Sequence, residues 1–131
     1  MDHVTAADLR AVALFQGLTD DELARITEWF EVKPVAAGDV LAREGASGYA
    51  FMVLGTASAE VHHGDEVVNR LAPGDFFGEA SILGSGRRTA TVTATTPGTM
   101  FVLFGTRFRE LQLQHPDLKA TIEAVFASRT Q

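Results

Sequence analysis

The apolar and polar positions of this chain repeat with a helical period at its two ends and with a strand period between them. Near the N-terminus, a capping box at Thr5 and Asp8 opens a segment with helical spacing, which predicts one short helix over residues 5–15. A second helix is predicted from Thr19, because Thr19 and Glu22 form a second capping box. The apolar residues expected to face the core on these two helices are Leu9, Val12, Ala13, Leu23, Ile26 and Phe30.

Between residues 31 and 104, short apolar runs alternate with polar positions and are separated by glycines. Turn signals at intervals of roughly 8–12 residues are typical of all-β sandwiches and barrels. The predicted fold class is therefore mainly β, a β-roll (jelly roll) of eight strands with flanking helices. The strands are expected near residues 31–36, 39–43, 49–54, 57–62, 66–71, 75–77, 88–95 and 99–104.

The helical period returns after residue 104. Residues 106–114 predict one helix, and Pro116 favours the first turn of another helix that runs to about Ser128. This last helix is amphipathic, so it fits either a packed core helix or a lid over a ligand. Its apolar stripe consists of Leu118, Ile122, Val125 and Phe126.

The composition limits the classes of function. A length of 131 residues with 46% hydrophobic residues fits one domain over residues 1–131, with a core large enough to fold alone. The formal net charge of −6 argues against a nucleic-acid partner, because phosphate backbones require clustered Lys and Arg. The chain has no cysteine, which excludes disulfides and favours a reducing, cytoplasmic location. We expect no signal peptide and no membrane span, because no apolar run is long enough.

The residues that carry chemistry concentrate in the segment 74–95. Gly78 gives the backbone unusual freedom, and residues 79–83 are long enough for one helical turn whose free N–H groups can bind an anion. On the strand that follows, neighbouring side chains point to opposite faces, so Arg88 lies on the apolar, inward face and Thr89 on the other. A charge on an inward face is costly unless an anion pairs with it, and a phosphate suits the planar fork of an arginine.

The residues before the loop complete this pattern. The amides of Ala80 and Ser81 would hold further phosphate oxygens, whereas an ionised Glu79 only accepts hydrogen bonds and therefore suits a sugar hydroxyl. Together they indicate a cradle for a ribose phosphate. Two plainer interpretations stay open, since Arg88 would also suit an ion pair with a surface carboxylate, and Glu79 would also stabilise the start of the helical turn.

The same residues resemble the phosphate-binding cassette of cyclic nucleotide-binding domains, which reads F-G-E, a few small or apolar residues, a short loop and then R-[AST]-A-x-V. Here the two parts are Phe77-Gly78-Glu79 and Arg88-Thr89-Ala90-Thr91-Val92. The resemblance implies that Glu79 contacts the ribose 2′-hydroxyl, that Arg88 binds the cyclic phosphate, and that the backbone from Gly78 to Ser81 binds the remaining phosphate oxygens. The chain departs from the usual pattern at Ala80 and at Arg87, and neither departure removes a ligand group.

The resemblance covers nearly the whole chain and implies a regulatory module of the kind found in catabolite activator proteins and protein kinase A regulatory subunits. Its ligand would be cyclic AMP or cyclic GMP, its other partner an effector domain or protein, and its C-terminal helix would close over the base. Thr89 bears on base choice, because cyclic GMP-responsive kinases and channels resemble each other in having Thr there. The resemblance leaves two partners open for its hydroxyl, the guanine amino group or, as for the Ser of bacterial cyclic AMP receptors, the phosphate. The ligand-binding residues predicted in this way are Phe77, Gly78, Glu79, Ala80, Ser81, Arg88, Thr89, Ala90 and Phe126.

Particular residues also bear on other classes of function. One alternative is a structural or protein-interaction β-roll without nucleotide binding, and another is a sensor of a different small effector, which would not need both Glu79 and Arg88. His62 and His63 are adjacent, so on a strand they point apart, and neither a metal site nor a cofactor is expected. No nucleophile motif is present, so we expect no enzymatic activity.

Overall fold

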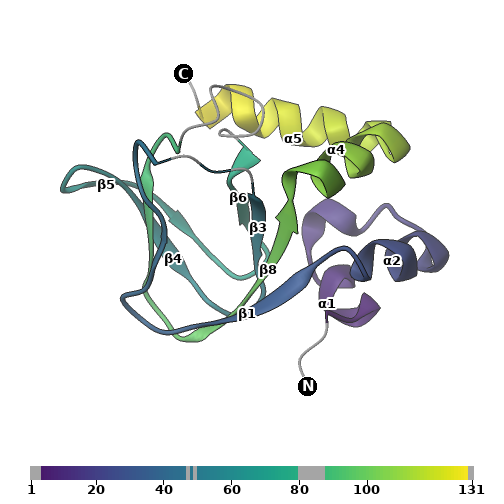
Figure 1. Ribbon diagram of the computed structural model, residues 1–131, viewed down its shortest axis with the longest axis horizontal. Helices are drawn as coiled ribbons and strands as arrows, with labels where there is room; N and C mark the ends of the chain where they lie inside the picture. The colour runs from purple at the N-terminus through teal and green to yellow at the C-terminus, as the bar shows by residue number, and fades with distance from the viewer. Residues whose placement is uncertain (1–3, 47, 49, 80–87, 130–131) are drawn as a thin grey trace.

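The computed structural model describes residues 4–46, 48, 50–79 and 88–129. Within these residues the chain forms two four-stranded antiparallel sheets that make a β-roll, with helices along one side of it (Figure 1). The predicted eight-stranded roll with flanking helices is confirmed. The strands are β1 (Glu31–Val35), β2 (Val40–Ala42), β3 (Ala50–Leu54), β4 (Ala59–His63), β5 (Glu66–Leu71), β6 (Phe76–Phe77), β7 (Thr91–Ala94) and β8 (Gly98–Phe104).

In the sheet with strand order β1-β8-β3-β6, strands β8, β3 and β6 are apolar on both faces, because one face packs on the helices and the other lines the interior of the roll. Successive residues therefore alternate between two hydrophobic clusters rather than between core and water. The helix-side cluster consists of Val4, Leu9, Val12, Phe15, Leu18, Leu23, Ile26, Phe30, Phe51, Val53, Phe76, Phe101, Leu103, Phe108, Leu111, Leu118 and Ile122. The roll-interior cluster consists of Val35, Ala42, Met52, Leu54, Ala57, Ala59, Leu71, Phe77, Val92, Ala94, Met100 and Val102.

The second sheet, with strand order β2-β7-β4-β5, alternates between core and surface. On β7, Val92 and Ala94 are buried, whereas Thr91 and Thr93 are only half-buried. β5 is an edge strand on which only Leu71 is buried. The amide of Arg70 on this edge donates to the side chain of Asn69 at 2.8 Å, so that donor is not available to another strand.

Two capping boxes begin the N-terminal helices, as predicted. The amide of Asp8 donates to Thr5 Oγ1 at 3.2 Å at the start of α1 (Ala6–Arg10). The amide of Glu22 donates to Thr19 Oγ1 at 3.1 Å at the start of α2 (Asp20–Thr27). Each reciprocal bond, from the cap amide to the acidic side chain, is also present. Local sequence thus sets where both helices begin.

The single helix predicted over residues 5–15 is wrong. Helix α1 ends at Arg10, and the chain continues as the 3-10 turn η1 (Ala13–Phe15). Between them Val12 is extended, with φ −86° and ψ 122°. This break turns Val12 and Phe15 into the helix-side cluster and leaves Ala13, which was expected to face the core, exposed.

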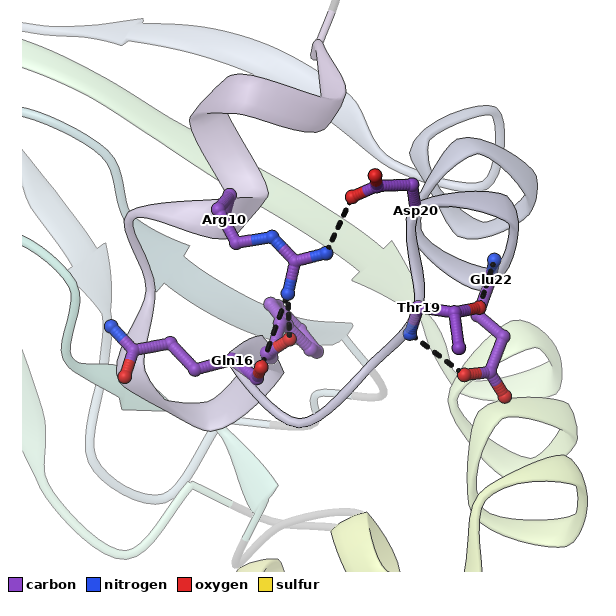
Figure 2. Close-up of polar contacts among 6 residues, drawn as sticks. Arg10, Gln16, Thr19, Asp20 and Glu22 are labelled. Carbon is purple, nitrogen blue, oxygen red and sulfur yellow. Dashed lines mark hydrogen bonds and ion pairs between the residues drawn. The ribbon is translucent and has the colours of Figure 1, made fainter.

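Arg10 joins the N-terminal segments to one another (Figure 2). Its guanidinium donates to the carbonyl of Gln16 at 3.1 Å and to Asp20 Oδ1 at 2.9 Å. It also approaches the carbonyl of Phe15 at 3.5 Å. One side chain therefore links the end of α1, the residues after η1 and the first turn of α2.

Two turns of the roll share the sequence Ala-x-Gly-Asp, at residues 36–39 and 72–75. In each turn a carboxylate oxygen of the aspartate accepts a hydrogen bond from the alanine amide at 2.8 Å. The glycine amides then donate to carbonyls at the ends of other strands, to Ala94 on β7 at 2.8 Å and to Leu54 on β3 at 2.7 Å. The same turn chemistry thus closes one strand end in each sheet.

Helices α4 (Gly105–Gln114) and α5 (Pro116–Arg129) follow β8 and agree with the two predicted C-terminal helices. Leu118 and Ile122 anchor α5 in the helix-side cluster, and Val125 packs against it. His115, between the two helices, places Nδ1 3.4 Å from Glu22 Oε2 on α2. The C-terminal helices are thus attached to the N-terminal ones. Among the described residues, no helix is both long and apolar enough to cross a membrane.

Candidate functional site

The end of β6 brings the predicted F-G-E residues to one end of the roll. Phe77 pairs with Met52 of β3 and contributes its ring to the roll-interior cluster. Gly78 has a φ of +94°, and a Cβ added there would lie 2.5 Å from the carbonyl oxygen of Ala50. Only glycine accepts both the positive φ and this close approach without strain. The next residue, Glu79, is 1% exposed, so this turn directs a carboxylate into the protein.

Arg88 reaches the same end of the roll from the segment that precedes β7 of the other sheet. Its amide donates to the carbonyl of Ala46 at 2.7 Å, and its own carbonyl accepts from the amide of Gly45 at 2.9 Å. These reciprocal bonds fix the Arg88 backbone to the loop between β2 and β3. The half-buried side chain then donates through Nη1 to the carbonyl of Ala50 at 3.2 Å, with the carbonyl of Gly78 at 3.5 Å.

The electrostatics of the site are dominated by this guanidinium. Burial lowers the pKa of Arg88 below its ordinary value, and the neighbouring Glu79 carboxylate raises it in part compensation. An arginine keeps its proton at neutral pH even so. The site therefore holds one cation and one buried carboxylate close enough to interact, a pair that suits a ligand with both an anionic group and hydroxyls.

The strand after Arg88 is shorter than predicted, since β7 spans only Thr91–Ala94 instead of 88–95. The ladder with β2 ends at the pair Ala42–Val92, and before it the Arg88 backbone bonds to loop residues instead. The predicted division of faces nevertheless holds where the residues are described. Ala90 is buried, whereas Thr89 is exposed.

The other predicted site residues include Ala80, Ser81 and Phe126. Ala80, Ser81 and the one-turn helix expected to follow Glu79 lie outside the described residues, as does Arg87. Phe126, the predicted capping residue, is half-buried on α5. In the view of Figure 1, α5 runs from the helices toward the roll.

Sequence reasoning missed two contributors to the surroundings of Arg88. The first is the carbonyl of Ala50, a backbone acceptor that no side-chain motif reveals. The second is Gly48, whose Cα lies against the guanidinium. The spacing of Gly45 and Gly48 was a signal, but a glycine-rich loop between strands also reads as an ordinary turn.

A second contact between ionisable side chains joins β4 to the loop that bonds to Arg88. His63 Nδ1 is 3.7 Å from Glu44 Oε1, and both side chains are about half exposed. Among the residues that the structure describes, no three His, Cys, Asp or Glu side chains gather as a metal site would require.

Comparisons with known proteins agree with the geometry. The family model described as "Cyclic nucleotide-binding domain" matches residues 32–115. The chain is 31% identical over 126 residues to a cAMP-dependent protein kinase regulatory subunit of Colletotrichum orbiculare, covering 88% of this chain and 32% of that protein. The chain thus spans less than a third of the length of this regulatory subunit.

Solved structures show the same fold. The regulatory domain of Toxoplasma gondii PKA, crystallised with cAMP, is similar with a TM-score of 0.69 and 28% identity over 80% of this chain and 42% of that one. The catabolite activator protein of Thermus thermophilus is similar with a TM-score of 0.77 and 25% identity over 89% of this chain and 57% of that one. With its roll, its F-G-E turn and its inward arginine, this chain belongs to the cyclic nucleotide-binding domain family.

Proposed function

We propose that this chain is a regulatory domain that binds a cyclic nucleotide and carries no catalytic activity of its own. The observation that supports this most directly is the meeting of the buried Glu79 carboxylate and the Arg88 guanidinium at one end of the roll. Cyclic AMP is the proposed physiological ligand, with appreciable binding of cyclic GMP. An effector domain or protein would read the bound state.

The two charged residues have separate roles in this proposal. Arg88 pairs with the cyclic phosphate, because a guanidinium donates two parallel hydrogen bonds to phosphate oxygens. Glu79 accepts a hydrogen bond from the ribose 2′-hydroxyl. The amides of Ala80 and Ser81 bind the remaining phosphate oxygens.

Calorimetric titration with cyclic AMP, cyclic GMP and linear 5′-AMP tests the proposal. We expect the cyclic nucleotides to bind and Arg88→Leu to lose roughly 10- to 100-fold in affinity, since a hydrogen bond to a charged group contributes about 1.5–3 kcal/mol. Arg70→Leu is the matched control, because Arg70 lies on the edge strand with a side chain that is 77% exposed. Absence of cyclic nucleotide binding by the parent would refute the proposal and favour a structural or protein-interaction role.

The role of Glu79 is tested by pairing a mutation with a change in the ligand. A 2′-deoxy cyclic nucleotide removes this contact, and Glu79→Gln weakens it by removing the charge of the acceptor, so the deoxy ligand should lose less affinity in the mutant than in the parent. A coupling energy near zero in this double-mutant cycle would place the Glu79 contact elsewhere.

Base preference is proposed to depend on Thr89. Its hydroxyl would bond the guanine amino group, and one neutral hydrogen bond is worth about 0.5–1.5 kcal/mol, so the preference should stay within about tenfold. Thr89→Ala should therefore reduce cyclic GMP affinity selectively. An unchanged ratio of the two affinities would refute the base contact.

Signal output is proposed to pass through α5, whose Phe126 would stack on the purine. Covering about 50–100 Å² of a ring face yields roughly 1–3 kcal/mol, which is enough to bias the position of a helix. Truncation within α5 would also remove Ile122, a fully buried core residue, so a point change is the cleaner test. Phe126→Ala should weaken cyclic nucleotide binding and speed release, and an unchanged release rate would make α5 plain scaffold.

A further inference from the structure

A second glycine lies against the arginine of the site. A Cβ built on Gly48 would overlap Nε of Arg88 and would lie 2.7 Å from Nη2. Real Cβ atoms do not approach other heavy atoms so closely. The space that a side chain at position 48 would occupy is therefore filled by the guanidinium of Arg88.

The loop that carries Gly48 is held beside Arg88 by its backbone. Gly45 and Ala46 exchange both hydrogen bonds with Arg88, at 2.9 and 2.7 Å. The amide of Glu44 also donates to Thr91 Oγ1 at 3.0 Å, which ties the start of the same loop to β7. These bonds hold residues 44–46, and the atoms that a Cβ at position 48 would meet all belong to the end of the flexible Arg88 side chain, so the clash is relieved most readily by movement of that side chain.

We infer that Gly48 is a positioning residue for Arg88. Because Gly48 has no side chain, the guanidinium of Arg88 can lie against it and donate to the carbonyl of Ala50. This inference rests on the proposed function, because the consequence of misplacing Arg88 is loss of phosphate binding.

Gly78 provides the contrast that makes the inference testable. There the nearest atom to an added Cβ is the backbone carbonyl oxygen of Ala50, and φ is positive, so the fold itself would be strained. At Gly48 all three nearest atoms belong to the far end of the Arg88 side chain, and φ is not in the positive range. A flexible side chain swings aside at low cost to stability. Gly48→Ala should therefore keep the fold and lose the ligand.

The experiment compares Gly48→Ala with Gly17→Ala in the full chain. An added Cβ at Gly17 meets no atom within 4 Å, so this variant controls for the glycine-to-alanine change itself. Titration with cyclic AMP should show a loss of roughly tenfold or more for Gly48→Ala and none for Gly17→Ala. The melting temperature of Gly48→Ala without ligand should stay within about 4 °C of the parent.

Two further measurements separate positioning from a merely structural effect. In the ligand-free protein, the ¹⁵N NMR signal of Arg88 Nε should move in Gly48→Ala and stay in place in Gly17→Ala. In an Arg88→Leu background, Gly48→Ala should cost no further affinity, because a residue that acts through Arg88 has nothing left to position.

The outcomes decide between the two ideas. If the parent binds and Gly48→Ala binds equally well, or if the two losses add in the double variant, the inference is overturned. A fall of more than about 8 °C in the ligand-free melting temperature would also overturn it, because the strain would then be in the fold. If the parent binds no nucleotide, the proposed function fails, and an unmoved Arg88 Nε signal would still refute the positioning role separately.

Discussion

The two faces of the sheet β1-β8-β3-β6 are filled by different kinds of side chain. Among the described residues, the helix-side cluster contains six phenylalanines, whereas the roll-interior cluster contains Phe77 alone and is otherwise made of alanine, valine, leucine and methionine. Large planar side chains give the helices a broad attachment to the sheet. The roll interior is filled mainly by aliphatic side chains, and the charged residues Glu79 and Arg88 lie at one end of the roll.

β3 shows the difference in three successive residues. The carbonyl of Ala50 accepts a hydrogen bond from Arg88, the ring of Phe51 packs among the helices, and Met52 faces the roll interior. The contacts that stabilise the fold and the contacts that form the site thus come from one strand but lie on different sides of it. This comparison predicts that the two can be damaged separately.

The largest expected effect is on the helix-side face. Phe51 is fully buried, and its ring centroid lies 4.8 Å from that of Phe108 and 5.2 Å from that of Phe76. Phe51→Ala should lower the free energy of unfolding by about 3–5 kcal/mol, measured by urea denaturation, because it removes the transfer free energy of the ring and leaves a cavity. Val68→Ala on exposed β5 should change it by less than about 0.5 kcal/mol. A loss for Phe51→Ala as small as this control would mean that the aromatic face does not hold the helices.

The next effect concerns the turn where the two faces meet the site. Gly78→Ala should cost about 1–3 kcal/mol for the positive φ, with a further loss from the overlap with the Ala50 carbonyl. Stability and nucleotide affinity should fall together in this variant, unlike in Phe51→Ala, whose folded fraction should still bind. Unchanged stability would show that the turn at Gly78 relaxes at no cost. The separation of stabilising contacts from site contacts, described for β3, would then not extend to β6.

A smaller effect is expected in the helical layer alone. Thr19→Ala removes the hydroxyl that accepts from the Glu22 amide at 3.1 Å and should cost about 1 kcal/mol in the free energy of unfolding. Thr19→Ser, which keeps the hydroxyl, is the control and should recover most of that loss. Nucleotide affinity measured on either variant should equal that of the parent, and a drop would couple the helical layer to the site.

The smallest effect is a dependence on pH. Hydrogen bonds from the backbone and side chain of Thr19, with a further contribution from His115, hold the pKa of Glu22 below its ordinary value of 4.5. A depressed carboxyl pKa contributes stability that is present above pH 4.5 and is lost as the pH falls through the lowered pKa. Glu22→Gln should flatten the decline in stability over this acidic range, whereas Glu66→Gln on β5 should not. Equal slopes in the two variants would remove Glu22 from the account.

Much of this architecture was readable from local patterns. The two capping boxes located the starts of α1 and α2, because each uses side chains only three residues apart. The alternation of alanine, valine and threonine from Thr89 to Ala94 assigned the faces of β7. The cassette residues Glu79 and Arg88 were expected to meet, and the structure brings them close enough to interact.

The features that escaped prediction depend on contacts distant in the sequence. The break after Arg10 buries Val12 and Phe15 in the helix-side cluster, most of whose members lie far along the chain. The shortening of β7 follows from its partner β2, whose ladder ends at Ala42. The place of Gly48 beside Arg88 depends on a loop that is forty residues away and is held by backbone bonds. No periodicity within one segment carries that information.

The paired Ala-x-Gly-Asp turns have a consequence for solvent exchange. The amides of Ala36 and Ala72 belong to exposed residues, and each donates to the carboxylate of its own turn at 2.8 Å. Hydrogen–deuterium exchange should therefore find these two amides slow although their residues are exposed, since exchange requires the local bond to open. Asp39→Ala and Asp75→Ala would each unprotect one of them, so the turn in each sheet would report its opening independently.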